Sequence, residues 1–237
     1  MSVPSNLEFE CVTDGGSENR AVAVANLVIA GWTGRDKEAM EKHMAELEEI
    51  GIPRPATAPC FYRASAEQLT QGNRIQVVGP DSSGEVEFCM VALEDGLWIG
   101  IASDHTDRKV EAYDVAVSKQ MCAKPVGRTL WRFDEVADHW DELLLKSEAV
   151  IDGETVPYQQ GGVANMLEPA RLIELYAGTG QSLASGTIMF GGTLAVIGGV
   201  RPGTRFSAVL EDPVLGRSMT LDYDIEFLNK EDTPKGE

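Results

Sequence analysis

The segment near the C-terminus constrains the fold of this chain more than any other stretch. From 219 to 227 apolar residues alternate with polar ones, the apolar positions being Met219, Leu221, Tyr223, Ile225 and Phe227. Successive side chains of a strand point to opposite faces, so this alternation predicts a strand with one face in a core and the other in water. The chain therefore needs a β-sheet that is covered on one face.

Several shorter segments also have the composition of strands. These are 22–30, 74–78, 86–93 and 97–102. Asp152-Gly153 predicts a tight hairpin turn between strands at 147–151 and 155–158.

Three segments have helical periodicity. The clearest is 36–50, where Met40, Met44, Leu47 and Ile50 recur at steps of three or four, and the others are 134–145 and 169–176. We expect an α+β, mainly β fold, with the long helix near the N-terminus lying over the sheet core.

Length and charge limit the class of protein. With 237 residues, 43% of them apolar, the chain can form one compact domain over 1–237, with 229–237 as a frayed tail. A net charge of −18 argues against nucleic acid and anionic membranes as partners, because both need a basic surface. It leaves a small anionic ligand possible where a metal or local cations offset the charge.

Cysteine spacing and the first residues bear on the compartment. The four cysteines are scattered without a CxxC pair, which favours reduced thiols. The stretch 1–16 lacks a basic region, and the longest apolar run, 21–31, is too short to span a bilayer. We expect a cytoplasmic protein.

Two carboxylates lie two residues apart in a predicted strand, at Glu85 and Glu87. Such side chains share a face roughly 7 Å apart, so both can approach one cation. A third acidic group follows the next strand at Asp104, with His105 and Asp107 also in reach. Oxygen ligands suit Mg²⁺, Mn²⁺ or Ca²⁺. Taken by spacing alone, a solvated strand face and a turn with Asp caps explain the same residues better than a metal site does.

The order of these strings resembles the fumarylacetoacetate hydrolase (FAH) superfamily over about 31–227. Glu85-Val86-Glu87 is similar to the Glu-x-Glu metal motif of that family, and the string 103–108 is similar to its Asn-Asp-x-(Ser/Thr)-Ala-Arg-Asp motif. The resemblance implies a mixed β-sheet or roll core with a short lid helix and few other helices. It also implies Glu85, Glu87 and Asp104 as ligands of a divalent metal ion, with Mg²⁺ or Mn²⁺ first and Ca²⁺ next.

The resemblance extends to residues that would bind the substrate. Lys119 precedes a string, 124–127, that is similar to the Pro-Leu-Gly-Pro turn of the family, and it would polarise an oxo-acid oxygen. The hairpin with Gln159 and Gln160 is similar to a family hairpin followed by Gln, and the remaining implied substrate contacts are Arg35, Arg63, Gln160 and Thr193. Leu194 and Val196 replace a Pro and a Gly of the family, which leaves the substrate open.

The general base implied by the resemblance lies on the first predicted helix. His43 and Glu46 are three apart, so they share a helix face, and they are similar to the His-x-x-Glu of the acylpyruvase branch. Asp36 stands seven residues before His43, which matches the metal-binding Asp of another branch. A solvated, Glu-rich helix face is the alternative explanation.

The resemblance implies a metal-dependent hydrolase or lyase, active on a 2-oxo or 2,4-dioxo acid through a metal-stabilised enolate. Hydratase or isomerase chemistry on an unsaturated oxo-acid uses the same enolate. A non-catalytic small-acid-binding protein on the same fold, or a structural β-rich domain, is the rival class. The family implies a homodimer.

Overall fold

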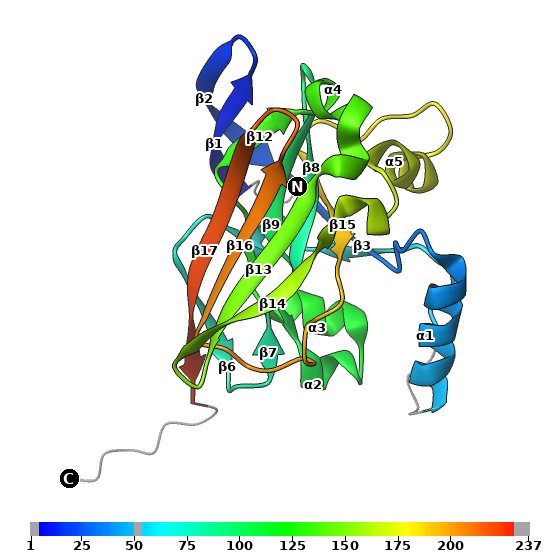
Figure 1. Cartoon of the computed structure of the whole chain (residues 1–237), viewed down its shortest axis with the longest axis vertical. Helices are drawn as coiled ribbons and strands as arrows, with labels where there is room; N and C mark the ends of the chain where they lie inside the picture. Colours follow the sequence, from blue (N-terminus) through cyan, green and yellow to red (C-terminus); the bar gives the residue numbers. More distant parts are fainter. Residues whose placement is uncertain (1–4, 50–53, 230–237) are drawn as a thin grey trace, which may run out of the picture.

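The computed structural model describes residues 5–49 and 54–229, and two β-sheets dominate it (Figure 1). The larger sheet has eight strands in the order β2-β1-β12-β9-β8-β15-β3-β4. Their bounds are β1 Ser5–Thr13, β2 Gly16–Val24, β3 Asn26–Gly31, β4 Cys60–Ala64, β8 Val86–Leu93, β9 Gly96–Ser103, β12 Thr129–Arg132 and β15 Thr187–Thr193.

The second sheet has five strands in the order β14-β13-β16-β17-β6. Their bounds are β6 Arg74–Val78, β13 Leu144–Ile151, β14 Glu154–Gly162, β16 Arg205–Asp212 and β17 Arg217–Leu228. Two short pairs join distant segments: β5 (Leu69–Thr70) with β11 (Lys124–Pro125), and β7 (Ser82–Ser83) with β10 (Thr106–Asp107). The pairs β1–β12, β3–β15 and β6–β17 are parallel, so the sheets are mixed.

Helices are few and short. The α-helices are α1 Lys37–Glu49, α2 Arg108–Glu111, α3 Val115–Met121, α4 Phe133–Val136 and α5 Pro169–Ala177. Three 3-10 helices, η1 Ala66–Gln68, η2 Ala137–Glu142 and η3 Val163–Asn165, complete the set that the described residues form. In Figure 1, α1 stands at the margin of the molecule, apart from both sheets, so the expectation that this helix lies over the sheet core is wrong. No helix in 5–49 or 54–229 has the length and apolar character needed to cross a membrane.

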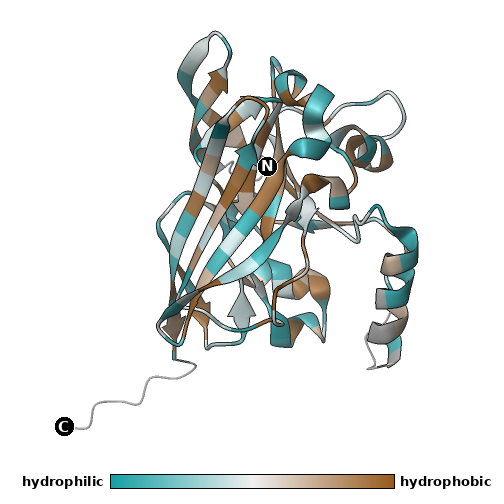
Figure 2. Cartoon of the chain, viewed as in Figure 1, coloured by the Kyte–Doolittle hydropathy of each residue, from teal (hydrophilic) through white to brown (hydrophobic). Residues whose placement is uncertain are grey.

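The central strand β8 has a hydrophobic cluster on each face. Phe88 and Met90 face the second sheet, where they join Phe206 and Tyr223 in one cluster. Alternate residues of β8 face a second cluster, which contains residues of both β1 and β3. Because β1 and β3 lie near opposite ends of the sheet order, the sheet must curl around this second cluster. Figure 2 shows the inner strands as largely hydrophobic and α1 as largely hydrophilic.

The mainly β, mixed-sheet prediction is confirmed, and several elements match in detail. Strands 74–78 and 86–93 have the predicted bounds, and the turn at Asp152-Gly153 has the positive φ values, 52° and 84°, of a tight hairpin. The expected single strand at 22–30 is wrong. The chain breaks at Ala25, because the N–H groups of Ala25 and Asn26 both donate to the Gly186 carbonyl oxygen.

The expected helix at 134–145 is also only partly correct. The segment divides into α4 and η2, with His139 at the non-helical kink, and Leu144 already starts β13. Within the predicted helix 36–50, residue 50 lies outside the described residues, as does the tail from 230 onward.

Candidate metal centre

Three carboxylates converge at one end of the β8–β9 hairpin. Glu85 directly precedes β8, Glu87 is its second residue, and Asp104 directly follows β9. The antiparallel register places Glu87 opposite Ala102, and the Asp104 N–H donates to the Glu85 carbonyl oxygen at 3.0 Å. One carboxylate oxygen from each residue lies within 4.8 Å of the other two.

The carboxylates share the face of β8 that the curled sheet encloses. Glu87 has the same orientation as Cys89 and Val91, two members of the enclosed cluster, because alternate strand residues share a face. Its side chain is 2% exposed and Asp104 is fully buried. The ligand atoms are thus largely withdrawn from water. Their attraction for a divalent ion is stronger in such a buried place than in water.

A glycine holds Glu87 in place. The Gly192 N–H donates to Glu87 Oε2 at 2.6 Å. Gly192 has a φ of 101°, and a Cβ there would lie 1.9 Å from Thr33 Oγ1. Only glycine satisfies both the backbone conformation and the close approach of the loop after β3.

Three cations face the three carboxylates. Lys119, on α3, binds Asp104 Oδ2, and the Nζ of Lys124, on β11, lies 3.0 Å from Asp104 Oδ1. Lys124 also donates to the His105 carbonyl oxygen at 2.5 Å and is fully buried. The Arg108 guanidinium lies 3.1 Å from Glu85 Oε1. Neither Lys124 nor Arg108 was predicted as a site residue, although both lie in strings that resemble the family, 103–108 and 124–127.

Burial and mutual repulsion shape the protonation of these groups. Burial, followed by the charges of Asp104 and Glu85, raises the pKa of Glu87 well above its usual value. Burial alone would raise the pKa of Asp104 as well, but Lys119 and Lys124 hold it below its usual range. The pKa of Lys119 is raised because Asp104 and Glu85 outweigh the effect of burial. A bound divalent ion would relieve the repulsion at Glu87.

A buried hydrogen-bond chain supports the segment that carries Asp104. The Tyr223 hydroxyl lies 2.8 Å from Ser103 Oγ and 3.0 Å from His105 Nδ1, while His105 Nε2 lies 2.9 Å from Ser82 Oγ. Burial, with the charge of Lys124, lowers the pKa of His105 to about 3, so the imidazole is neutral. His105 therefore ties β17 to β7 behind the carboxylates. Asp107 accepts from two N–H groups of α2 and caps that helix.

Thr193 lies beside the carboxylates, and the glutamine that contacts it is Gln159. Gln159 Nε2 donates to Thr193 Oγ1 and to the Leu194 carbonyl oxygen, both at 2.7 Å, and its Oε1 accepts from the Val86 N–H at 2.9 Å. Gln160, the predicted residue, is exposed. The bulge between Ser147 and Glu148 shifts the register of this hairpin, and Pro157, beside it on the edge strand β14, is the one sequence signal for it.

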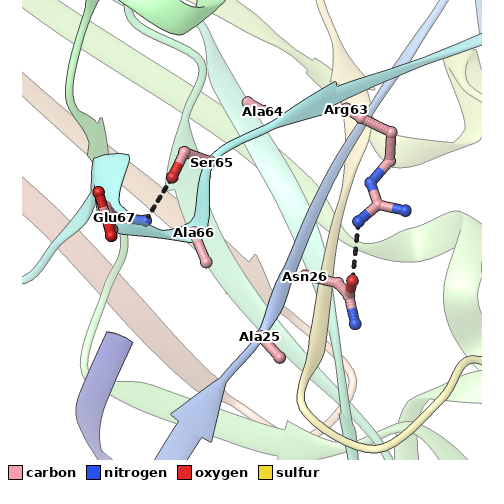
Figure 3. A pocket seen from close by; sticks show the side chains of 7 residues that line it. All are labelled: Ala25, Asn26, Arg63, Ala64, Ser65, Ala66 and Glu67. Carbon is pink, nitrogen blue, oxygen red and sulfur yellow. Dashed lines mark hydrogen bonds between the residues drawn. The ribbon is translucent and has the colours of Figure 1, made fainter. Parts of the chain in front are cut away.

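The two predicted substrate arginines pair with residues outside the carboxylate group. Arg35 makes a bidentate ion pair with Asp141, at 2.6 and 2.8 Å, and donates to the Met166 carbonyl oxygen. Arg63 donates to Asn26 Oδ1 at 2.7 Å and lines an open pocket of about 240 Å³ with 64–67 (Figure 3).

Tyr62 is the residue of β4 on the side of the carboxylates. Its ring centroid lies 5.8 Å from Lys119 Nζ, and it packs against the enclosed cluster. Because neighbouring strand residues point to opposite faces, Arg63 faces away from this side.

The predicted base lies on α1. The backbone of His43 and Glu46 belongs to that helix, but their side chains lie outside the described part of the structure. Asp36 Oδ1 accepts from the N–H groups of Glu38 and Ala39, each at 3.0 Å, so Asp36 caps α1.

The donor set fits a hard divalent cation. Three carboxylate oxygens at a strand end match the ligands that Mg²⁺, Mn²⁺ and Ca²⁺ prefer, and neither sulfur nor imidazole belongs to the group. The curled mixed sheet, with acidic groups at the end of its central hairpin, agrees with the FAH fold class that the sequence resemblance implies.

Solved structures of this fold class support that assignment. A protein assigned as a fumarylpyruvate hydrolase from Burkholderia cenocepacia is 16% identical, with a TM-score of 0.62 over 96% of this chain and 98% of the other. A 2-keto-3-deoxyarabinonate dehydratase is 17% identical, with a TM-score of 0.63 over 92% and 78%. A fumarylacetoacetate hydrolase family protein from yeast is 16% identical, with a TM-score of 0.58 over 86% and 94%. At these identities the likeness concerns the fold.

The sequence itself matches one family. The chain belongs to DUF2848, described as a protein of unknown function, whose family model matches residues 30–223. The comparison with curated proteins gave no match.

Proposed function

We propose that this protein is a divalent-metal-dependent hydrolase or lyase for a 2-oxo or 2,4-dioxo acid. The observation that carries the proposal is the convergence of Glu85, Glu87 and Asp104, with Lys119 on the last of them. A divalent ion held there would polarise the oxo-acid oxygens and stabilise an enolate.

The remaining roles follow from the positions of the side chains. The ion pair with Asp104 keeps the Lys119 ammonium group charged. This ammonium group lies next to the Tyr62 ring, where it would bind an anionic oxygen of the substrate. Thr193, whose hydroxyl accepts from Gln159 and donates to the Val86 carbonyl oxygen, would line the part of the site that takes the substrate carboxylate. We assign His43, oriented by Glu46, as the base on α1 that moves the proton.

Several reactions of 2-oxo acids share the chemistry that this site would support. The fold class includes a protein assigned as a fumarylpyruvate hydrolase and a 2-keto-3-deoxyarabinonate dehydratase. Hydrolysis, decarboxylation and loss of water from a 2-oxo acid all develop negative charge on the same oxygen. The proposal therefore covers the acid class, with hydration or isomerisation of an unsaturated oxo-acid as the second candidate. We further propose a homodimer in the cytoplasm.

A substrate panel tests the proposal. Acylpyruvates, oxaloacetate and unsaturated 2-oxo acids are incubated with the protein and Mg²⁺ or Mn²⁺, and loss of the substrate is followed by absorbance and mass spectrometry. We expect turnover that needs the ion and disappears in a Glu85→Ala, Glu87→Ala double variant. Turnover that survives chelation and the double variant would exclude the metal mechanism. Tight binding of the acids without turnover would identify a binding protein instead.

A further inference from the structure

Asp104 is held by two buried lysines, although one would neutralise it. Lys119 binds Oδ2 and Lys124 lies 3.0 Å from Oδ1. Both side chains are almost wholly withdrawn from solvent, with 8% of Lys119 and none of Lys124 exposed. Neither charge is screened by water, so each acts on the whole carboxylate cluster.

With all three carboxylates ionised, and counting only the cations paired with them, the cluster is balanced without a metal ion. Glu85, Glu87 and Asp104 contribute three negative charges, and Lys119, Lys124 and Arg108 contribute three positive ones. Glu111, at the rim, shares Arg108 at 3.0 Å, and its side chain is 31% exposed. The inner part of the site therefore has little net negative charge to attract a free cation. A divalent ion alone would leave it with an excess of about two positive charges.

The excess would be removed by an anionic ligand. Resting on the proposed function, we propose that Lys124 makes binding of the metal ion depend on binding of an acid: the ion binds weakly alone and tightly together with an oxo-acid anion. Lys124 is thus a positioning and charge-setting residue for the metal site. Such mutual dependence is a coupling free energy, and the acid must bind more tightly with the ion by the same factor.

The position of Lys124 is fixed by the backbone, which makes its charge a permanent part of the site. Lys124 pairs with Leu69 in the short β11–β5 ladder, and the Val126 N–H donates to the Thr70 carbonyl oxygen at 2.9 Å. Its ammonium also donates to the His105 carbonyl oxygen at 2.5 Å. The side chain cannot leave Asp104 without leaving that carbonyl group unpaired.

Calorimetric titration of Mn²⁺ into the full chain, with and without saturating oxalate, tests the inference. Oxalate is a doubly charged probe that resembles the carboxylate and oxo group of a 2-oxo acid, and its own Mn²⁺ complex in buffer is subtracted. For the natural chain we expect oxalate to strengthen Mn²⁺ binding by roughly 5–150-fold, the usual span of such couplings. In Lys124→Met, Mn²⁺ alone should bind about tenfold more tightly or better, and the effect of oxalate should shrink.

Two further variants make the outcome decisive. Lys124→Gln removes the charge but keeps a donor for the His105 carbonyl oxygen, so it replaces Lys124→Met if that variant fails to fold. Lys146→Met removes one positive charge from β13, where the lysine pairs with Glu211 at 2.6 Å and is 38% exposed, and should bind Mn²⁺ like the natural chain.

The titrations distinguish failure of the proposed coupling from failure of the proposed function. Equal Mn²⁺ affinity in the natural chain and both Lys124 variants would overturn the coupling and leave the metal site intact. Weaker binding in the variants would show that Lys124 supports the ligands and would also overturn it. Absence of Mn²⁺ binding in every variant, with or without oxalate, would overturn the proposed function and the coupling together.

Discussion

The N–H group of Gly192 lies 2.6 Å from Oε2 of Glu87, so the end of β15 orients a carboxylate of β8. One carboxylate oxygen of Glu87 lies within 4.8 Å of carboxylate oxygens of Glu85 and Asp104. The backbone thus fixes the geometry of the carboxylate before any ligand arrives.

Replacing Glu87 with Gln should therefore weaken metal binding without disturbing the fold. Gln keeps an oxygen for the Gly192 N–H but removes one of three negative charges, and we expect Mn²⁺ affinity to fall at least about tenfold. Calorimetry measures the affinity and circular dichroism checks the fold. Glu148→Gln, an exposed change on β13, is the matched control and should bind Mn²⁺ normally. Unchanged affinity in Glu87→Gln would remove Glu87 from the ligand set.

Gly192→Ala should destabilise the protein through a contact that can be relieved. The new Cβ would lie 1.9 Å from Thr33 Oγ1, and overpacking of this kind costs roughly 1–3 kcal/mol in the free energy of unfolding. Removing that oxygen in a Thr33→Ala, Gly192→Ala double variant should recover part of the loss, the strained φ of 101° accounting for the rest. Denaturant titration of both variants and of Thr33→Ala completes the cycle. Strictly additive losses would contradict the contact.

Neighbouring glutamines on β14 should respond differently to the same change. Gln159→Leu leaves the Val86 N–H and the Leu194 carbonyl oxygen without a hydrogen-bond partner. Each such buried polar group lowers the free energy of unfolding by about 1–3 kcal/mol. Gln160→Leu, at an exposed position, should stay within about 0.5 kcal/mol of the natural chain. Thermal unfolding followed by circular dichroism separates them. Similar melting temperatures for the two variants would contradict the register of β14.

Asp212 should make stability depend on acidity. Burial tends to raise its pKa, but the Leu215 N–H, His139 and Arg217 together lower it. Because the pKa of Asp212 is lower in the folded state than in the unfolded state, its ionised form stabilises the fold at pH values above the usual pKa of Asp. This stabilisation is lost as the pH falls through the pKa of the folded state. Asp212→Asn should therefore cost roughly 2–4 kcal/mol at pH 7, with the difference shrinking below about pH 4.

An exposed carboxylate on the neighbouring strand provides the comparison for Asp212. Asp222 pairs with Arg205 on the surface, with 44% and 47% of the two side chains exposed. Asp222→Asn should cost under about 1 kcal/mol at every pH, because exposed ion pairs contribute little. Melting temperatures of both variants between pH 3 and pH 8 provide the test, and a loss for Asp212→Asn that does not vary with pH would contradict the assigned pKa direction.

Local pattern was enough to predict some elements of the fold, because alternation and turn chemistry act over a few residues. The strand from 86 to 93 and the turn at Asp152-Gly153 are examples. Parallel pairing of β1 with β12 joins segments more than a hundred residues apart, and no local signal encodes it. The candidate carboxylates could be predicted from the sequence because a hairpin of neighbouring strands brings them together. Lys124 was missed as a site residue, since its contact with Asp104 depends on the β5–β11 pairing.

The three carboxylates come from a single hairpin, within 85–104, while Tyr62, Lys124 and Gln159 come from β4, β11 and β14. Recombination between relatives could therefore transfer the whole acidic set in one exchange of about twenty residues. The surrounding side chains would have to diverge one strand at a time. The ancestry of the acidic set and the ancestry of its surroundings can thus differ, and a gene tree built on 85–104 need not agree with one built on the rest of the chain.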